Sequence, residues 1–159
     1  MELRLANKAE IAAHSKRWHG WFEQDPDREK FWHQTTSAGA KVERPNATQL
    51  RGILSARGYK CFLILVNDEP VGHIGIARKG NESHLSIYVN PDERGRLIGL
   101  NALQLFKKAA MQAPMKFGRV VADIRKDHDA STKLFMKAGA IEIRHPETPT
   151  GCRRFELVR

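Results

Sequence analysis

The sequence predicts a mixed α+β fold, because helical and strand patterns occupy different stretches of one chain of ordinary domain length. The chain has 159 residues and a mass of 18.1 kDa, which suits a single domain with one core. Apolar residues in the first third follow helical spacing, whereas short apolar runs bounded by turn residues begin at Lys60. Helical spacing returns between the later strands. We therefore expect residues 1–159 to form one domain.

The chain opens with a short strand and a capped helix. Glu2–Leu5 alternates charged and apolar residues, as a strand at the start of a sheet does. Asn7 and Glu10 have the spacing of a capping box, so a first helix begins there and reaches about Phe22.

Two further helix starts follow in the N-terminal third. Asp25-Pro26 combines an N-cap residue with a proline at the first helical position, for a helix that runs through Trp32 before a loop at 37–46. Thr48 is expected to cap a third helix, which stops at Gly58.

From Lys60 onward the pattern indicates an antiparallel meander and then alternating helices and strands. Three short apolar runs are separated by Asn-Asp-Glu and Lys-Gly-Asn turns. The expected strands of the meander are Cys61–Val66, Val71–Ala77 and His84–Val89. After it we expect a helix at Leu97–Met111, a strand at Phe117–Ile124, a helix at Ala130–Ala138 closed by Gly139, and strands at Ala140–Arg144 and Arg154–Val158.

Composition narrows the class of protein and its partners. The longest apolar run, Cys61–Val66, is far shorter than a membrane span, and 1–7 does not have the pattern of a secretion signal, so we expect a cytoplasmic protein with no membrane partner. Cys61 and Cys152 are expected to be free thiols, since their spacing suits no metal site.

The charge balance is strongly basic. The chain carries 27 Lys and Arg against 18 Asp and Glu, which gives a net charge of +9. A polyanion is therefore expected among its ligands, unless the excess only solvates the surface. The basic residues are spread along the whole chain without a basic tail, so nucleic acid is a partner class that the sequence does not favour.

The segment with the clearest chemistry joins the third strand of the meander to the long helix. The first backbone N–H groups of a helix have no intrahelical acceptors, so a helix start can hold a pyrophosphate. Gly95 and Gly99 allow a close approach of the backbone, while Arg94 and Arg96 add positive charge. A plain solvated turn explains the same residues about equally well. The glycine patterns of nicotinamide-binding and ATP-binding loops do not occur.

Two stretches of the sequence resemble motifs of the GNAT superfamily of acyl-CoA-dependent N-acyltransferases. The run from Tyr88 to Gly99 looks like the acetyl-CoA motif of that family, and the run from His128 to Ala140 is similar to its second motif. Val71-Gly72 also fits the hairpin of the family. Together these features cover roughly residues 47–144 in the expected order.

The resemblance implies a fold, a cofactor and a reaction. The fold is a mixed, mostly antiparallel sheet of about seven strands flanked by helices, whose fourth and fifth strands splay apart. Acetyl-CoA would lie in the wedge and would donate its acetyl group directly to a primary amine of an unidentified acceptor. The implied cofactor-binding residues are Ile87, Val89, Arg94, Gly95, Arg96, Leu97, Ile98, Gly99, His128, Ser131 and Phe135.

Three residues depart from the family pattern. Leu97 stands where the acetyl-CoA motif has its first glycine, and His128 replaces a common asparagine. Phe135 replaces the tyrosine that often protonates the leaving thiolate, and a phenylalanine has no proton to donate. A CoA-binding or partner-binding module without turnover is therefore one alternative, and a basic acetyltransferase for an RNA-linked amine is another.

The candidate catalytic residues are Glu82, His84 and Tyr88. Glu82 and His84 begin the strand where the family often places its base, and they share strand parity with Tyr88. His73 is a further candidate, with a structural duty as the stronger interpretation. No metal motif is present, and the sequence is compatible with either a monomer or a homodimer.

Overall fold

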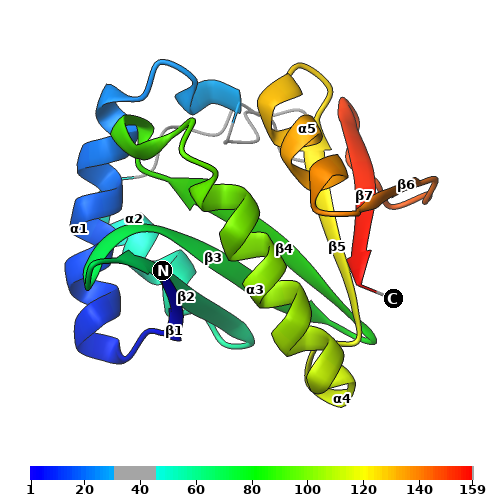
Figure 1. The fold of residues 1–159 in the computed structure, drawn as a ribbon, viewed down its shortest axis with the longest axis horizontal. Helices are drawn as coiled ribbons and strands as arrows, with labels where there is room; N and C mark the ends of the chain where they lie inside the picture. Colours follow the sequence, from blue (N-terminus) through cyan, green and yellow to red (C-terminus); the bar gives the residue numbers. More distant parts are fainter. Residues whose placement is uncertain (31–45, 159) are drawn as a thin grey trace.

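The computed structural model describes residues 1–30 and 46–158, which form a seven-stranded sheet with helices on both faces (Figure 1). The strand order is β1-β2-β3-β4-β5-β7-β6. Neighbouring strands are antiparallel except β4 and β5, which run parallel. The mixed, mostly antiparallel sheet predicted from the sequence is thus confirmed. The strands are β1 Glu2–Leu5, β2 Tyr59–Val66, β3 Glu69–Lys79, β4 Glu82–Val89, β5 Arg119–Arg125, β6 Ile141–Ile143 and β7 Cys152–Val158.

The helices cover the sheet from two sides. One buried cluster joins the sheet to the long helix α3 and to α5, and a second cluster joins the first strands to α1 and α2. Alternation along β2 divides its side chains between them, since Ile64 belongs to the first cluster and Leu63 to the second. The helices are α1 Lys8–Gln24, α2 Ala47–Leu54, α3 Ile98–Gln112, α4 Pro114–Phe117 and α5 Asp129–Lys137, with 3-10 turns at Arg28–Lys30 and Pro91–Glu93.

The strands β4 and β5 diverge along their length, which confirms the splay that the family resemblance implies. They pair only at their beginnings, where Glu82–His84 faces Arg119–Val121. Beyond His84, β4 pairs with β3 alone, and Figure 1 shows β4 and β5 separating away from the end near α4. The unpaired edges of two adjacent strands therefore face each other across an open wedge.

The N-terminal third departs from the prediction in two places. Within the described residues, Asp25-Pro26 leads only to the 3-10 turn Arg28–Lys30, and the rest of the predicted second helix, including Trp32, lies outside them. The cap of α2 is Asn46 and not Thr48, because Asn46 and Gln49 form a reciprocal capping box with bonds of 2.9 and 2.8 Å.

Other element boundaries agree more closely with the sequence. The Asn7–Glu10 capping box starts α1, as predicted. Gly139 adopts a φ of 87° directly after the C-cap of α5, as expected for a closing glycine. Phe117 ends α4 instead of beginning β5.

The structure also shows the state of the cysteines and the character of the helices. Cys61 and Cys152 are both free and buried, and burial raises the pKa of the Cys61 thiol to about 12. Among the described helices, none combines the length and the apolar character that a bilayer crossing requires. The described residues also contain no group of three or more side chains placed to hold a metal ion.

Candidate functional site

Two cavities meet in the wedge between β4 and β5. The first, of about 410 Å³, lies between the diverging strands and is lined by residues of β4, β5 and α1. The second, of about 420 Å³, lies between the loop before α3 and the helix α5. Ile87, His128 and Ser131 line both cavities, so the two lie next to each other. We call the second cavity the loop end and the first the strand end.

The start of α3 brings backbone N–H groups without intrahelical acceptors to the loop end. Gly95 and Leu97 both have left-handed conformations, with φ of 80° and 61°, and such alternation turns successive amides toward one concavity. The first intrahelical bond of α3 runs from the Asn101 amide to the Leu97 carbonyl over 3.0 Å. The amides of Ile98 and Gly99 precede it, and the Leu97 side chain provides no cap. This geometry is suited to an anion.

The arginines of the loop have partners of their own. Both terminal nitrogens of Arg94 donate to the carboxylate of Asp25, at 3.0 and 2.6 Å, and its Nε donates to the Val89 carbonyl. Arg96 is 68% exposed at its side chain and pairs with Glu93. The sequence predicted that both guanidinium groups add charge to the anion site. In the structure, Lys133 and Lys137 are the cations that line the loop end beside Arg94.

A buried carboxylate behind the cavities joins Tyr88 of the strand end to Arg94 of the loop end. Asp25 is 1% exposed and accepts a hydrogen bond of 2.6 Å from the Tyr88 hydroxyl in addition to those from Arg94. Burial raises the pKa of Asp25, but the hydrogen bonds from Arg94 and Tyr88 outweigh it and the net pKa is lowered. Burial and the Asp25 carboxylate raise the pKa of Tyr88, so this hydroxyl keeps its proton.

Two histidines and a tryptophan close the strand end on the side of α1. The Nε2 atom of His14 lies 2.9 Å from Nδ1 of His73, and the His14 Nδ1 atom lies 3.0 Å from a terminal nitrogen of Arg17. The ring of His73 packs edge-on against Trp18, with centroids 4.4 Å apart, and stacks on Tyr88. Burial, reinforced by Arg17, lowers the pKa of His14 to about 3, and burial holds the pKa of His73 well below its ordinary value.

A tyrosine that the sequence analysis missed also reaches the strand end. The Tyr59 hydroxyl lies over Gly75 and shares a hydrogen bond with Ser86, and burial raises its pKa to about 12. A Cβ atom on Gly75 would lie 1.7 Å from this hydroxyl, so only glycine admits it. A glycine in the middle of a predicted strand is the signal that could have revealed the close approach.

The predicted catalytic residues lie in two different places. Tyr88 lines the strand end, whereas Glu82 and His84 line a separate cavity of about 500 Å³. His84 Nε2 lies 3.0 Å from Glu82, and its Nδ1 lies 3.8 Å from Asp123, which lines both cavities. The register of β3 and β4 is regular, so Glu82, His84 and Tyr88 share one face as the sequence indicated, but they are separated along the strand.

The predicted cofactor-binding residues mostly come together. All of them except Arg96 line the loop end, the strand end or both. Phe135 is 2% exposed and lines the strand end without offering a proton donor. Sequence reasoning missed Asp25, Tyr59, Ser86 and Asp123 as parts of the site, because their partners lie far away along the chain.

Comparison with protein families gives a match over most of the chain. The model of the acetyltransferase (GNAT) domain matches residues 3–141. No curated protein sequence is significantly similar to this chain.

Several solved structures share the fold at low sequence identity. Aminoglycoside acetyltransferase AAC(6′)-Ib in complex with coenzyme A has a TM-score of 0.70 and 15% identity, over 97% of this chain and 91% of that chain. The GNAT domain of PAT from S. lividans has a TM-score of 0.70 and 18% identity, over 97% and 88%. Ribosomal-protein-alanine N-acetyltransferase from Brucella melitensis has a TM-score of 0.65 and 20% identity, over 98% and 97%.

Proposed function

The chain belongs to the GNAT acetyltransferase family, and we propose that it transfers an acetyl group from acetyl-CoA directly to a primary amine. The observation that supports this most is the uncapped start of α3, which lines a cavity next to the one between β4 and β5. A diphosphate at the loop end and an extended arm along the free edge of β4 suit these two features together.

The residues present fit coenzyme A. The amides of Gly95–Gly99 would hold the diphosphate, and Lys133 and Lys137 would add positive charge beside it. Ile87 offers its main-chain groups, and Val89 its N–H, on the edge of β4 that faces the wedge, while the Val89 carbonyl already accepts from Arg94. When bound, acetyl-CoA supplies an activated acetyl thioester.

The chain offers its own donor for the proton that the leaving thiolate needs. Phe135 stands where the family often has a tyrosine and cannot provide it. Tyr59 lines the same cavity, and a tyrosine hydroxyl carries its proton at neutral pH. We assign the proton donation to Tyr59, and we expect a Tyr59→Phe variant to lose about 10²-fold or more in kcat.

The base that takes the proton of the amine is assigned to the Glu82–His84 pair. These side chains are 3.0 Å apart, and His84 lies 3.8 Å from Asp123, which also lines the strand end. Tyr88 is proposed as a positioning residue instead, because its hydroxyl is held by Asp25.

An added negative charge at the loop end tests the assignment of the cofactor site. Gly99 packs 3.2 Å from Leu134, measured from an ideal Cβ, and a Gly99→Glu side chain brings bulk and negative charge to the diphosphate amides. We expect the Kd for coenzyme A, measured by isothermal titration calorimetry, to rise at least about tenfold. Gln104→Glu is the matched control, since it adds the same charge on an exposed position further along α3. Equal affinity in both variants would contradict the site.

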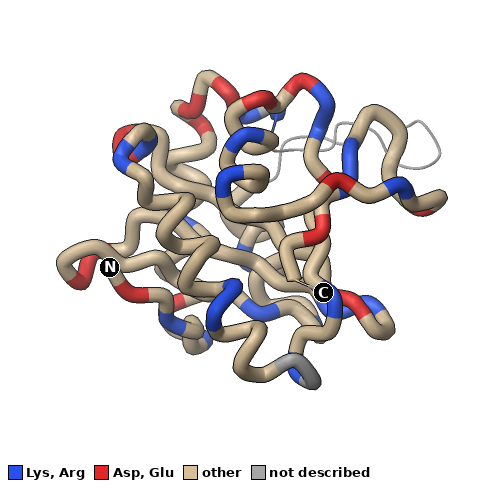
Figure 2. The backbone as a smooth tube through the Cα atoms, turned by 45° about the vertical axis from the view of Figure 1, so that its right-hand side comes forward, with Lys and Arg blue, Asp and Glu red and all other residues tan. Residues whose placement is uncertain are grey.

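A CoA-binding module without turnover is the second candidate, and the absence of a hydroxyl on Phe135 favours it. Consumption of acetyl-CoA over a panel of polyamines, amino sugars and peptide N-termini separates the two. Tight coenzyme A binding with no amine acetylated would favour the module. Figure 2 shows Lys and Arg distributed over many segments without one basic stripe. An acetyltransferase that acts on an RNA-linked amine is therefore less favoured than either of these two functions.

A further inference from the structure

We propose that Trp18 and His73 form an uncharged pair of hydrogen-bond donors for an oxygen atom of the acyl acceptor. The chain would then prefer primary amines that carry a hydroxyl, ether or carbonyl oxygen close to the reacting nitrogen. This inference rests on the proposed acetyltransferase function and specifies its substrate class.

The hydrogen-bond chain behind His73 fixes which of its nitrogens carries the hydrogen. A guanidinium group can only donate, so Arg17 requires Nδ1 of His14 to be an acceptor. Neutral His14 therefore carries its hydrogen on Nε2 and donates it to Nδ1 of His73, 2.9 Å away. Neutral His73 must then carry its own hydrogen on Nε2. His73 is a donor in this arrangement and has no lone pair left to act as the base.

Trp18 supplies a second donor beside the first. Its Nε1 atom is buried and has no hydrogen-bond partner among the described residues, and its ring is 9% exposed. The same residues provide no acceptor for Nε2 of His73. Both side chains line the strand end, with ring centroids 4.4 Å apart and planes at 69°. Buried donors are normally satisfied, so the unsatisfied Trp18 Nε1, with His73 Nε2 unpartnered among the described residues beside it, indicates a ligand atom that accepts from them.

The pair is also compatible with a positively charged ligand. Burial keeps the pKa of both histidines low, so neither becomes an imidazolium at neutral pH. An amine acceptor arrives largely as an ammonium ion, and a charged histidine would repel it. The carboxylates nearby are Asp25, which Arg94 pairs, and Asp123 across the cavity on β5.

The position of His73 favours the acceptor over the thioester as the source of the oxygen. His73 lies on β3 and is the cross-strand neighbour of Tyr88, on the face of the sheet that α1 covers. The arm of coenzyme A is expected along the opposite edge of β4, toward β5. The donor pair thus lies one strand away from the thioester, over the face where a second substrate has room.

Matched amines that differ in one oxygen test the proposal. The probes are 2-methoxyethylamine and n-butylamine, in which a methylene group replaces the ether oxygen. The ratio of their kcat/KM values is compared between wild type and variants, so that the intrinsic basicity of each amine cancels. We expect the preference for the ether to fall about fivefold to tenfold in Trp18→Phe and in His73→Met.

A conservative variant separates recognition from structural support. His73→Gln keeps an oxygen that accepts from His14 and an N–H that donates to the ligand, so its preference should stay within about twofold of wild type. An unchanged ratio in Trp18→Phe and His73→Met would overturn the proposal. A fall in kcat that is equal for both amines would also overturn it, because it would assign the donors to the thioester carbonyl.

A binding measurement decides the matter even without turnover. In ¹⁵N NMR spectra of the chain with coenzyme A bound, the Trp18 indole signal should shift with 2-methoxyethylamine and not with n-butylamine. His73 should show the spectrum of a neutral ring with hydrogen on Nε2. The opposite tautomer or a charged ring would refute the donor pair. Lack of turnover with these signals intact would count against the proposed function alone.

Discussion

The two ends of the wedge differ in the groups that line them: backbone amides at the loop end and side chains from several elements at the strand end. At the loop end, the cavity is lined by Gly95 and by Leu97–Gly99 at the start of α3, and the guanidinium of Arg94 beside them is paired with a buried carboxylate. At the strand end, side chains from α1, β2, β3 and β5 meet, and several of them are buried polar groups. One end is therefore local in sequence, and the other is assembled from the whole fold.

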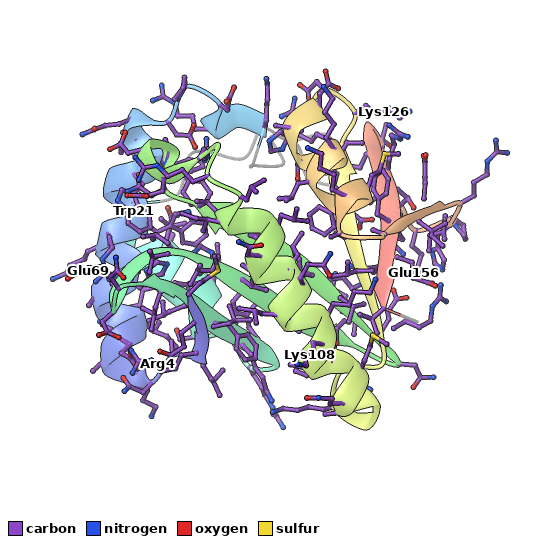
Figure 3. The ribbon with its side chains drawn as sticks, in the orientation of Figure 1. Arg4, Trp21, Glu69, Lys108, Lys126 and Glu156 are labelled. Carbon is purple, nitrogen blue, oxygen red and sulfur yellow. The ribbon has the colours of Figure 1, made fainter. Side chains whose placement is uncertain are left out.

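This contrast indicates that the two ends suit different tasks in substrate binding. A site made of amides recognises a group common to all acyl-CoA molecules and needs little from side-chain identity. A site made of buried aromatic and titratable side chains is sensitive to each residue, so it suits discrimination among acceptors. Figure 3 shows Trp21 on α1 and Lys126 after β5 on opposite sides of the molecule.

The largest effect is expected from breaking the ion pair between the two ends. Asp25 has a fully buried side chain, and Arg94 is its bidentate partner. Arg94→Met leaves the carboxylate without its countercharge, so the free energy of unfolding should fall by about 3–5 kcal/mol. Urea denaturation measures this. The Asp25→Asn/Arg94→Met double variant should recover part of the loss, and simple additivity of the two single variants would contradict the pairing.

Acid should weaken the strand end through its histidines. The pKa of His14 is lowered from 6.5 to about 3 in the folded chain, and that of His73 is lowered as well. Since the unfolded chain binds more protons below pH 6.5, stability is complete above that pH and is lost as the pH falls. For each histidine that stays neutral in the folded chain, the free energy of unfolding should fall by about 2 kcal/mol between pH 7 and pH 5.

Urea denaturation of wild type and of a His14→Gln/His73→Gln double variant over this pH range checks the attribution. The double variant should lose most of the slope between pH 7 and pH 5. Identical slopes in both proteins would show that other groups cause it.

The close approach of Tyr59 to Gly75 predicts a smaller loss. A methyl group at Gly75 would collide with the hydroxyl, so Gly75→Ala should cost about 1–2 kcal/mol, measured by chemical denaturation. In a Tyr59→Ala background the same substitution should cost much less. A cost that is the same in both backgrounds would mean that the collision is not what Gly75 avoids.

The smallest effect concerns the strain at the loop end. Leu97 adopts a left-handed conformation, with φ of 61° and ψ of 12°, which costs a non-glycine residue about 1 kcal/mol. Leu97→Gly should therefore raise stability by about 0.5 kcal/mol after its greater freedom in the unfolded chain is counted. Leu97→Ala keeps the Cβ atom and should give no such gain in thermal unfolding. A gain shared by both variants would point to the exposed leucine side chain instead.

The same contrast explains how much the sequence could predict. The loop end was readable because its glycines, the helix start and the preceding strand are contiguous. The strand end was not, since His14 and His73 are 59 residues apart and Asp25 and Arg94 are 69 residues apart. Asp25 looked like a helix cap, and nothing near it in the sequence shows that Arg94 and Tyr88 hold its carboxylate.

The order of the elements followed directly from the sequence, but some boundaries did not. Apolar spacing and capping residues identified β1 through β7 in the correct order. The sequence pattern predicts the cap of α2 at Thr48; Asn46 is as good a cap residue, and only its reciprocal bonds with Gln49 distinguish it. The splay of β4 and β5 came from the family resemblance alone.

The measurement that tests the central claim most directly is a ¹⁵N NMR titration of the chain with coenzyme A. If the start of α3 holds the diphosphate and β4 carries the arm, the largest shifts should fall on the amides of Gly95–Gly99 and on Ile87. Shifts confined to the cavity around Glu82 and His84, with the start of α3 unaffected, would contradict the account.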